Sequence, residues 1–185
     1  MKTRTGGRSG FTLIEMLIIL AIMAALAAVL LPTLTNQIQK SEVSRVTGDL
    51  TNLRTAAEAF LVDVHRYPGD IEDLGTPITA TDTDADTVAY PPGLVARWDG
   101  PYIDRVVADG DSLETGFGGQ IQDDLVKVEY PAASGIFYLT VNVSGFAQSD
   151  FDRVDEGMDD ADGAAAGRLR WITPDTVRFL AIPIN

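Results

Sequence analysis

An apolar run from Phe11 to Leu31 contains a single charged residue, Glu15, and this run restricts the fold more than any other feature of the sequence. As a helix rising about 1.5 Å per residue, its 21 residues are long enough to cross a hydrocarbon core of about 30 Å. A carboxylate near the centre of a spanning helix costs roughly 2.5 to 3.5 kcal/mol, so Glu15 indicates a partner or a function. Three cations and no acid precede the run. The positive-inside bias therefore predicts a cytoplasmic N-terminus and an exported remainder.

Two simpler interpretations of the run are a secretory signal peptide, with a cleavage site near Ala25-Leu26-Ala27, and a plain membrane anchor. The apolar part of a signal peptide is normally 7 to 15 residues long and uncharged. This run is longer, contains Glu15, and continues past Pro32 into an amphipathic pattern. These differences favour a retained membrane segment with a role for its carboxylate.

Residues 10–15 read Gly-Phe-Thr-Leu-Ile-Glu, which resembles the leader junction of type IV pilins and of the type II secretion pseudopilins. The resemblance implies that a prepilin peptidase cuts between Gly10 and Phe11, removes a basic leader of residues 1–10, and methylates the new N-terminal Phe11. It also implies that Glu15 of one subunit neutralises the Phe11 amine of its neighbour in a filament.

The chemistry of the junction supports this pairing independently of the family. A cation in lipid is as costly as an anion unless the two are paired. Phe11 and Glu15 are four residues apart and hence on one helical face, so either the same chain or a neighbour can present Glu15 to the amine. The resemblance implies that the neighbour presents it, which would make Glu15 an assembly residue.

Beyond Pro32 the apolar residues follow one another at steps of three and four, which predicts a helix with one buried face. This face comprises Val43, Val46, Leu50, Leu53, Ala57, Phe60 and Val64. We expect one helix from Phe11 to His65, with residues 11–32 in the membrane or filament core and residues 33–66 as the amphipathic half. Pro32 is expected to kink or locally melt it and is a second assembly candidate.

Residues 67–185 are predicted to form one exported globular domain, because their number suffices for one small core. The expected strands are 126–130, 135–143, 168–172 and 176–182, the last two forming a hairpin. A long helix packed on an antiparallel sheet is an α+β arrangement, and the resemblance implies the same fold, the pilin fold.

Two segments of this domain resemble the major pseudopilin of type II secretion in particular. They are Arg66-Tyr67-Pro68 at the predicted helix end and Trp98-Asp99-Gly100-Pro101-Tyr102-Ile103 in the following region. This favours a secretion pseudopilus, with a type IV pilus subunit as the alternative.

An acidic loop is expected over residues 148–163, in the region where the major pseudopilin carries a calcium loop. Calcium accepts oxygen ligands from flexible loops, and Asp159, Asp160 and Asp162 are the candidate ligands. The spacing does not match an EF-hand, since Met158 and Leu169 would occupy ligand positions. A solvated acidic loop without metal is the alternative.

Composition weighs against other functional classes. The chain has no cysteine, no Gly-x-Ser-x-Gly motif and a single histidine, His65, so nucleophilic catalysis has few candidate residues and we expect no enzyme. Without the leader, 11 Lys and Arg face 27 Asp and Glu, a net charge of −16, which opposes binding to nucleic acid. An adhesin using Trp98, Tyr102 and Trp171 is a further alternative, although large aromatics more often fill a core.

These observations predict a structural filament subunit that spans the bacterial inner membrane once, with its C-terminal domain in the periplasm. The resemblance implies self-assembly, other pilins or pseudopilins, the prepilin peptidase, and an inner-membrane assembly platform with a cytoplasmic ATPase as partners. The pseudopilus would lie in the periplasm, and a pilus would extend from the cell surface.

Overall fold

The computed structural model describes residues 11–104, 112–115, 118–172 and 174–184. Its compact units are residues 1–41 and 42–185. We call the second unit, residues 42–185, the head. The helix α1 (Leu13–Val64) runs through the first unit from Leu13 onward and is also the first element of the head.

In the first unit, α1 carries large apolar side chains that are exposed from Leu13 to Ile38. The helix is continuous through Pro32, so local melting, one of the two effects expected of this proline, is not observed. A continuous apolar surface of this kind needs a covering.

In the head, α1 ends at Val64, one residue before the predicted end. His65 follows with a positive φ of 62°, and the chain then turns through Tyr67 and Pro68. The predicted buried face is confirmed: Val46, Leu50, Leu53, Ala57, Phe60 and Val64 are buried, and Val43 is partly buried against them. This face packs in one core with the sheet residues Leu139, Val141 and Phe179.

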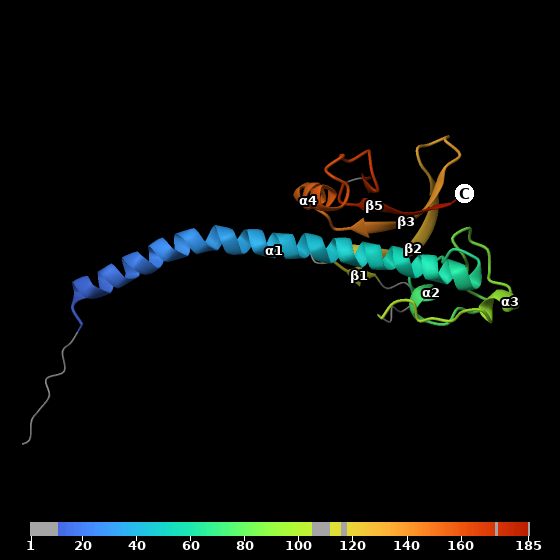
Figure 1. Cartoon of the computed structure of the whole chain (residues 1–185), viewed down its shortest axis with the longest axis horizontal. Helices are drawn as coiled ribbons and strands as arrows, with labels where there is room; N and C mark the ends of the chain where they lie inside the picture. The colour runs from blue at the N-terminus through green and yellow to red at the C-terminus, as the bar shows by residue number, and fades with distance from the viewer. Residues whose placement is uncertain (1–10, 105–111, 116–117, 173, 185) are drawn as a thin grey trace, which may run out of the picture. The chain divides into compact units, whose positions relative to one another are not determined.

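The sheet has five antiparallel strands in the order β1-β2-β3-β5-β4 (Figure 1). The strands are β1 (Leu113–Glu114), β2 (Gln120–Glu129), β3 (Phe137–Ser144), β4 (Leu169–Trp171) and β5 (Val177–Ile184). The α+β arrangement is confirmed, and β4 and β5 form the predicted hairpin, with Leu169 opposite Phe179.

Along the chain, two short helices follow α1 and precede the first strand: α2 (Glu72–Gly75) and α3 (Pro92–Val95). A longer helix, α4 (Gln148–Met158), follows β3. The loop predicted over residues 148–163 is therefore wrong for its first eleven residues. Phe151 and Val154 are buried on one face of α4, and this apolar pair at helical spacing outweighs the many acids around it.

The sequence predicted that this strand begins at Val126, whereas β2 begins six residues earlier, at Gln120. The pairing register of β2 shifts between Ile121 and Leu125, and both of these residues are buried. This irregularity breaks the strict two-residue alternation on which the prediction relied.

Candidate functional site

The first turn of α1 contains a reciprocal pair of contacts between Thr12 and Glu15. The backbone N–H of Thr12 donates to Glu15 Oε2 at 3.4 Å, and the backbone N–H of Glu15 donates to Thr12 Oγ1 at 3.3 Å. This is a capping box, in which a threonine and a glutamate three residues later satisfy each other's free amides. The sequence analysis missed it, although the Thr-x-x-Glu spacing signals it. Glu15 thus has a helix-capping role to set beside its predicted role in assembly.

The other predicted residues of the N-terminal segment can be placed only in part. Gly10 lies outside the described residues, and Phe11 is 70% exposed just before the helix. Among the described residues, α1 is the one helix long and apolar enough to cross a membrane, and none of its most apolar window is buried.

A second candidate site lies where α4 ends. Carboxylate oxygens of Asp155, Asp159 and Asp162 lie within 4.8 Å of one another. Two of these residues, Asp159 and Asp162, were predicted ligands, whereas Asp160 is not part of the cluster. Asp155 was missed because the segment was treated as a loop; on a helix, its spacing of four from Asp159 places both on one face.

Backbone contacts fix the orientation of this acidic cluster. Asp159 Oδ2 accepts the backbone N–H of Arg168 and, at 2.7 Å, that of Leu169, which begins β4. Asp155 Oδ2 accepts the N–H of Gly163 at 3.0 Å. Gly167 has a φ of +67°, and a Cβ there would collide with the carboxylates of Asp159 and Asp162. The chain therefore wraps closely around the three carboxyl groups.

The cluster still has unused acceptor capacity. Asp155 is only 3% exposed, and its Oδ1 is buried without a hydrogen-bond partner. The pKa of Asp162 is raised, mainly by partial desolvation and to a smaller extent by repulsion from the carboxylates of Asp159 and Asp155. Three acids that crowd one another, one of them with an unsatisfied buried oxygen, make a donor set suited to a hard cation.

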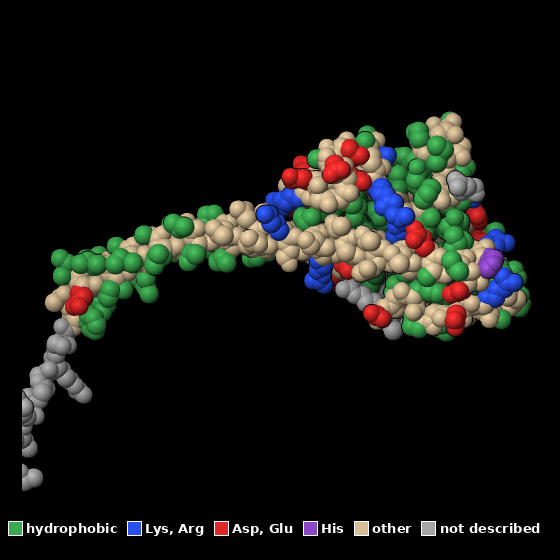
Figure 2. Space-filling view, viewed as in Figure 1, with side chains coloured by type: hydrophobic (Ala, Val, Ile, Leu, Met, Phe, Trp, Pro, Cys, Tyr) green, Lys and Arg blue, Asp and Glu red, His purple; other side chains and the backbone are tan. Residues whose placement is uncertain are grey.

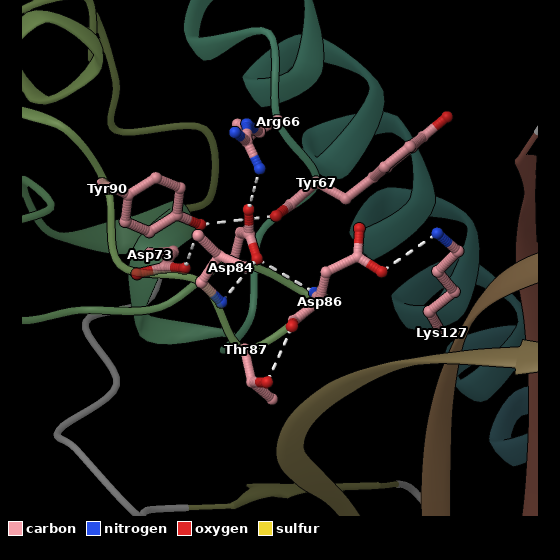
Figure 3. A network of polar contacts seen from close by, with 9 residues as sticks. Arg66, Tyr67, Asp73, Asp84, Asp86, Thr87, Tyr90 and Lys127 are labelled. Atoms are coloured by element: carbon pink, nitrogen blue, oxygen red, sulfur yellow. Dashed lines mark hydrogen bonds and ion pairs between the residues drawn. The ribbon is translucent and has the colours of Figure 1, made fainter.

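The segment between α1 and β1 is organised by a buried carboxylate, Asp73 (Figure 3). Its Oδ2 accepts the hydroxyl of Tyr90 at 2.9 Å and the N–H of Gly69 at 3.0 Å. Its backbone oxygen accepts Trp98 Nε1 at 2.8 Å. Asp73 thereby joins three stretches of chain that are distant in sequence.

A second buried carboxylate, Asp84, completes the polar network of Figure 3. Arg66 forms an ion pair with Asp84 Oδ2 at 2.7 Å. Asp84 Oδ1 accepts the backbone N–H groups of Asp86 and Val88. Lys127 of β2 pairs with Asp86 at 3.0 Å. The network holds this segment against both the end of α1 and the sheet.

The aromatic residues considered for adhesion contribute to the packing of the head. Trp98, Tyr102 and Trp171 are partly buried and pack against the core. The Tyr102 hydroxyl donates to Asp63 of α1 at 2.9 Å, and its ring lies edge-on to Phe60 with centroids 5.6 Å apart. The segment that resembles the major pseudopilin therefore fastens the chain to α1.

Asp73 gives the head a pH-dependent stability. Burial, the main cause, raises its pKa to about 7, against an unfolded value of about 3.9. Between these values the unfolded chain has released a proton that the folded chain still holds. The free energy of unfolding should therefore fall as pH rises from about 4 to 7, by up to about 4 kcal/mol, and then level off.

Replacing Asp73 by Asn should remove most of this slope, because the amide does not titrate. Urea unfolding at several pH values between 4.5 and 8 would measure it, with the exposed Asp99→Asn as the matched control. Parallel pH profiles for the wild type and Asp73→Asn would contradict the assignment.

Comparisons with known proteins agree with the N-terminal geometry. The family model described as the prokaryotic N-terminal methylation motif matches residues 6–31. Fimbrial protein Q of Moraxella bovis is 36% identical over 147 residues, which cover 74% of this chain and 88% of that protein.

The names of two further relatives refer to different systems. Type II secretion system core protein G of Klebsiella michiganensis is 30% identical over 105 residues, 54% of this chain and 74% of the relative. Type IV major fimbrial protein FimA of Dichelobacter nodosus is 46% identical over 56 residues, 30% of this chain and 36% of FimA. No solved structure gives a significant match.

Four observations point to one group of proteins: the methylation motif, the exposed apolar helix whose first turn is capped by Glu15, the α+β head, and the long match to a fimbrial protein. This chain belongs to the family of type IV pilins and type II secretion pseudopilins.

Proposed function

We propose that this chain is a structural subunit of a type IV-like filament, and that the filament is the pseudopilus of a type II secretion system. The observation that carries the proposal is the exposed apolar half of α1 directly behind a prepilin methylation motif. Such a surface requires lipid before assembly and other helices after it.

In the proposed mechanism the basic leader, residues 1–10, keeps the precursor in the inner membrane with its N-terminus in the cytoplasm and its head in the periplasm. A prepilin peptidase cuts between Gly10 and Phe11 and methylates the new amine. Glu15 of a neighbouring subunit neutralises this amine as the helix leaves the lipid. The assembly platform, its ATPase and other pseudopilins are the proposed partners. Pro32 is proposed to shape the helix within the filament core.

Three observations support a pseudopilus. The first is the similarity to a type II secretion core protein G, and the second is the segment from Trp98 to Tyr102, which resembles the major pseudopilin and fastens the chain to α1. The third is the absence of cysteine, because many type IV major pilins close their C-terminal region with a disulfide. The longer match to a fimbrial protein favours the second candidate, a subunit of a surface pilus. Both candidates share the assembly mechanism and differ in where the filament lies.

The first experiment is the mass and N-terminal sequence of the protein purified from its native membrane. The proposal expects a chain that begins at N-methylated Phe11. A start at Met1 or near Ala28 would overturn it. Deleting the protein then separates the two candidates, because loss of a pseudopilus blocks the export of folded proteins, whereas loss of a pilus removes surface filaments and leaves export intact.

We further propose that the acidic cluster of Asp155, Asp159 and Asp162 binds calcium. The unsatisfied Oδ1 of Asp155 and the close wrapping at Gly167 support a fit for a hard cation. When bound, calcium would neutralise the mutual repulsion of the three carboxylates. Because Asp159 also holds the start of β4, the ion would stabilise the edge of the sheet.

Calcium at 100 times its dissociation constant should therefore raise the unfolding free energy of the full chain by about 2.7 kcal/mol. Asp162→Asn should abolish this increase, since Asp162 belongs to the cluster. Asp160→Asn is the matched control: Asp160 is an exposed neighbour outside the cluster with a φ of 57°, which asparagine tolerates. A melting temperature of the wild type that does not respond to calcium would overturn the site.

A further inference from the structure

The tip of the β2–β3 hairpin, residues 131–137, has no charged side chain of its own, and Lys127 and Glu129 of β2 flank it, with Lys127 Nζ 5.3 Å from the centre of the Phe137 ring. Residues 131–137 read Pro-Ala-Ala-Ser-Gly-Ile-Phe, and every one is exposed, with Ile136 at 47% and Phe137 at 37%. The hairpin, orange at the upper right of Figure 1, forms a lobe that Figure 2 shows in green and tan. Single exposed apolar residues are ordinary, but a contiguous group of them marks an interaction surface.

The tip is held in one conformation by its own hydrogen bonds. The N–H of Tyr130 donates to Ile136 O at 2.9 Å, and the N–H of Ser134 donates to Pro131 O at 3.1 Å. The N–H of Gly135 donates to a carboxylate oxygen of Glu129 at 2.6 Å. A surface ordered in this way loses little conformational entropy when a partner binds.

A second uncharged surface lies elsewhere on the head, where α1 and α4 meet. It is a hollow of about 420 Å³ lined by residues of α1 such as Val43, Ser44, Gly48 and Thr51, together with Gly157 of α4. Its lining contains no charged side chain. A Cβ at Gly157 would lie 3.0 Å from Val43 Cγ1, so a larger residue there would encroach on the hollow. The hollow can accept short apolar side chains without desolvating a charge.

The tip and the hollow lie at opposite ends of β3. Phe137 begins the strand beside the tip, and Ser144 ends it four residues before α4. Eight residues at about 3.3 Å each give β3 a length of roughly 26 Å, and Figure 1 shows the hairpin tip at one end of the strand and α4 at the other, so one copy does not fill its own hollow. Two different surfaces that join head to tail do not form a twofold dimer; they generate rings or open helical arrays, and an open array is compatible with the proposed filament.

We propose that the hairpin tip of one subunit docks into the α1–α4 hollow of a second copy of this chain. The inference rests on the proposed filament function and names a contact between heads within that filament. Charge explains the choice of partner surfaces: heads that share a strongly negative charge repel one another. Pairing the tip residues with the hollow brings the heads together through side chains that carry no charge, and Glu129 beside the tip is already held by the N–H of Gly135.

Cysteine crosslinking tests this contact directly, because the natural chain has no cysteine. The full-length chain would carry Ala133→Cys in the tip and Ser44→Cys at the hollow, both exposed positions, in cells lacking the wild-type copy. Oxidation should convert the double variant into a ladder of covalent multimers. Each single variant should remain monomeric, and co-expression of the two single variants should stop at dimers.

Filaments of the double variant that give no ladder would overturn the inference and leave the filament function intact. Dimers of Ala133→Cys alone would also overturn it, because they require two tips to meet. A wild-type chain that forms no filaments in its native cells would instead overturn the proposed function itself.

A charge at the tip provides a second test. Ile136→Glu should lower filament yield at least tenfold, because the carboxylate would enter an uncharged hollow. Val88→Glu adds the same charge at a position of equal exposure, 47%, away from both surfaces, and should leave the yield unchanged. Equal yields from the two variants would contradict docking of the tip.

Discussion

Replacing Glu15 by Ala is expected to leave the protein in the membrane and to lower filament yield roughly a hundredfold. The reason is the amine that the proposed cleavage would free on Phe11: it would have no partner in lipid once the carboxylate is removed, at a cost of about 2.5 to 3.5 kcal/mol. Membrane insertion depends on the apolar run and should not suffer. Carbonate-washed membranes and sheared or immunopurified filaments would measure the two quantities separately.

Glu15→Gln distinguishes the charge from the capping box. Glutamine at this position can still accept the amide of Thr12, since capping boxes use either residue, but it cannot neutralise an amine. If charge pairing drives assembly, the glutamine variant fails like the alanine variant. If filaments return with glutamine, the cap and not the charge is what assembly needs.

Replacing Phe60 by Ala is expected to destabilise the head by about 3 to 5 kcal/mol, the usual cost of emptying a buried aromatic site. Phe60 is fully buried, and its ring lies edge-on to Tyr90 at 6.1 Å and to Tyr102 at 5.6 Å. The change therefore loosens α1 from the segment that follows it. Since domains are stable by only about 5 to 15 kcal/mol, a loss of this size would unfold a considerable fraction of molecules near their working temperature.

Urea unfolding of the full chain in detergent, followed by the fluorescence of Trp98 and Trp171, would measure this loss. Val62→Ala is the matched control, because Val62 lies on the same helix two residues away and is 71% exposed. Its expected effect is below about 0.5 kcal/mol. A cost below 1 kcal/mol for Phe60→Ala would show that the core closes around the missing ring.

Elements with strong periodicity could be predicted from the sequence. The apolar face from Val46 to Val64 repeats over five turns, so the helix and its buried side followed directly from the pattern. The β4–β5 hairpin was also predictable, because Thr173-Pro174-Asp175 punctuates two apolar runs. Both signals are local, and tertiary packing reinforces them.

Features that depend on distant contacts could not be predicted. Gly69, Tyr90 and Trp98 all donate hydrogen bonds to Asp73, and nothing in their spacing along the sequence indicates these contacts. The acidic cluster was predicted with Asp160 and without Asp155, because the segment's low hydrophobicity hid the helix that brings Asp155 beside Asp159. A carboxylate's neighbours depend on the backbone beneath it, and that backbone is set by the core.

The position of β5 inside the sheet limits when the head can fold. This strand, the last of the five along the chain, fills the gap between β3 and β4 and supplies core residues such as Val177 and Phe179. Until residues 177–184 are in place, β3 has an unpaired edge and the core is open on one side. The head can therefore close only after these residues have been synthesised, and in the proposed topology the chain would cross the membrane before its head has folded.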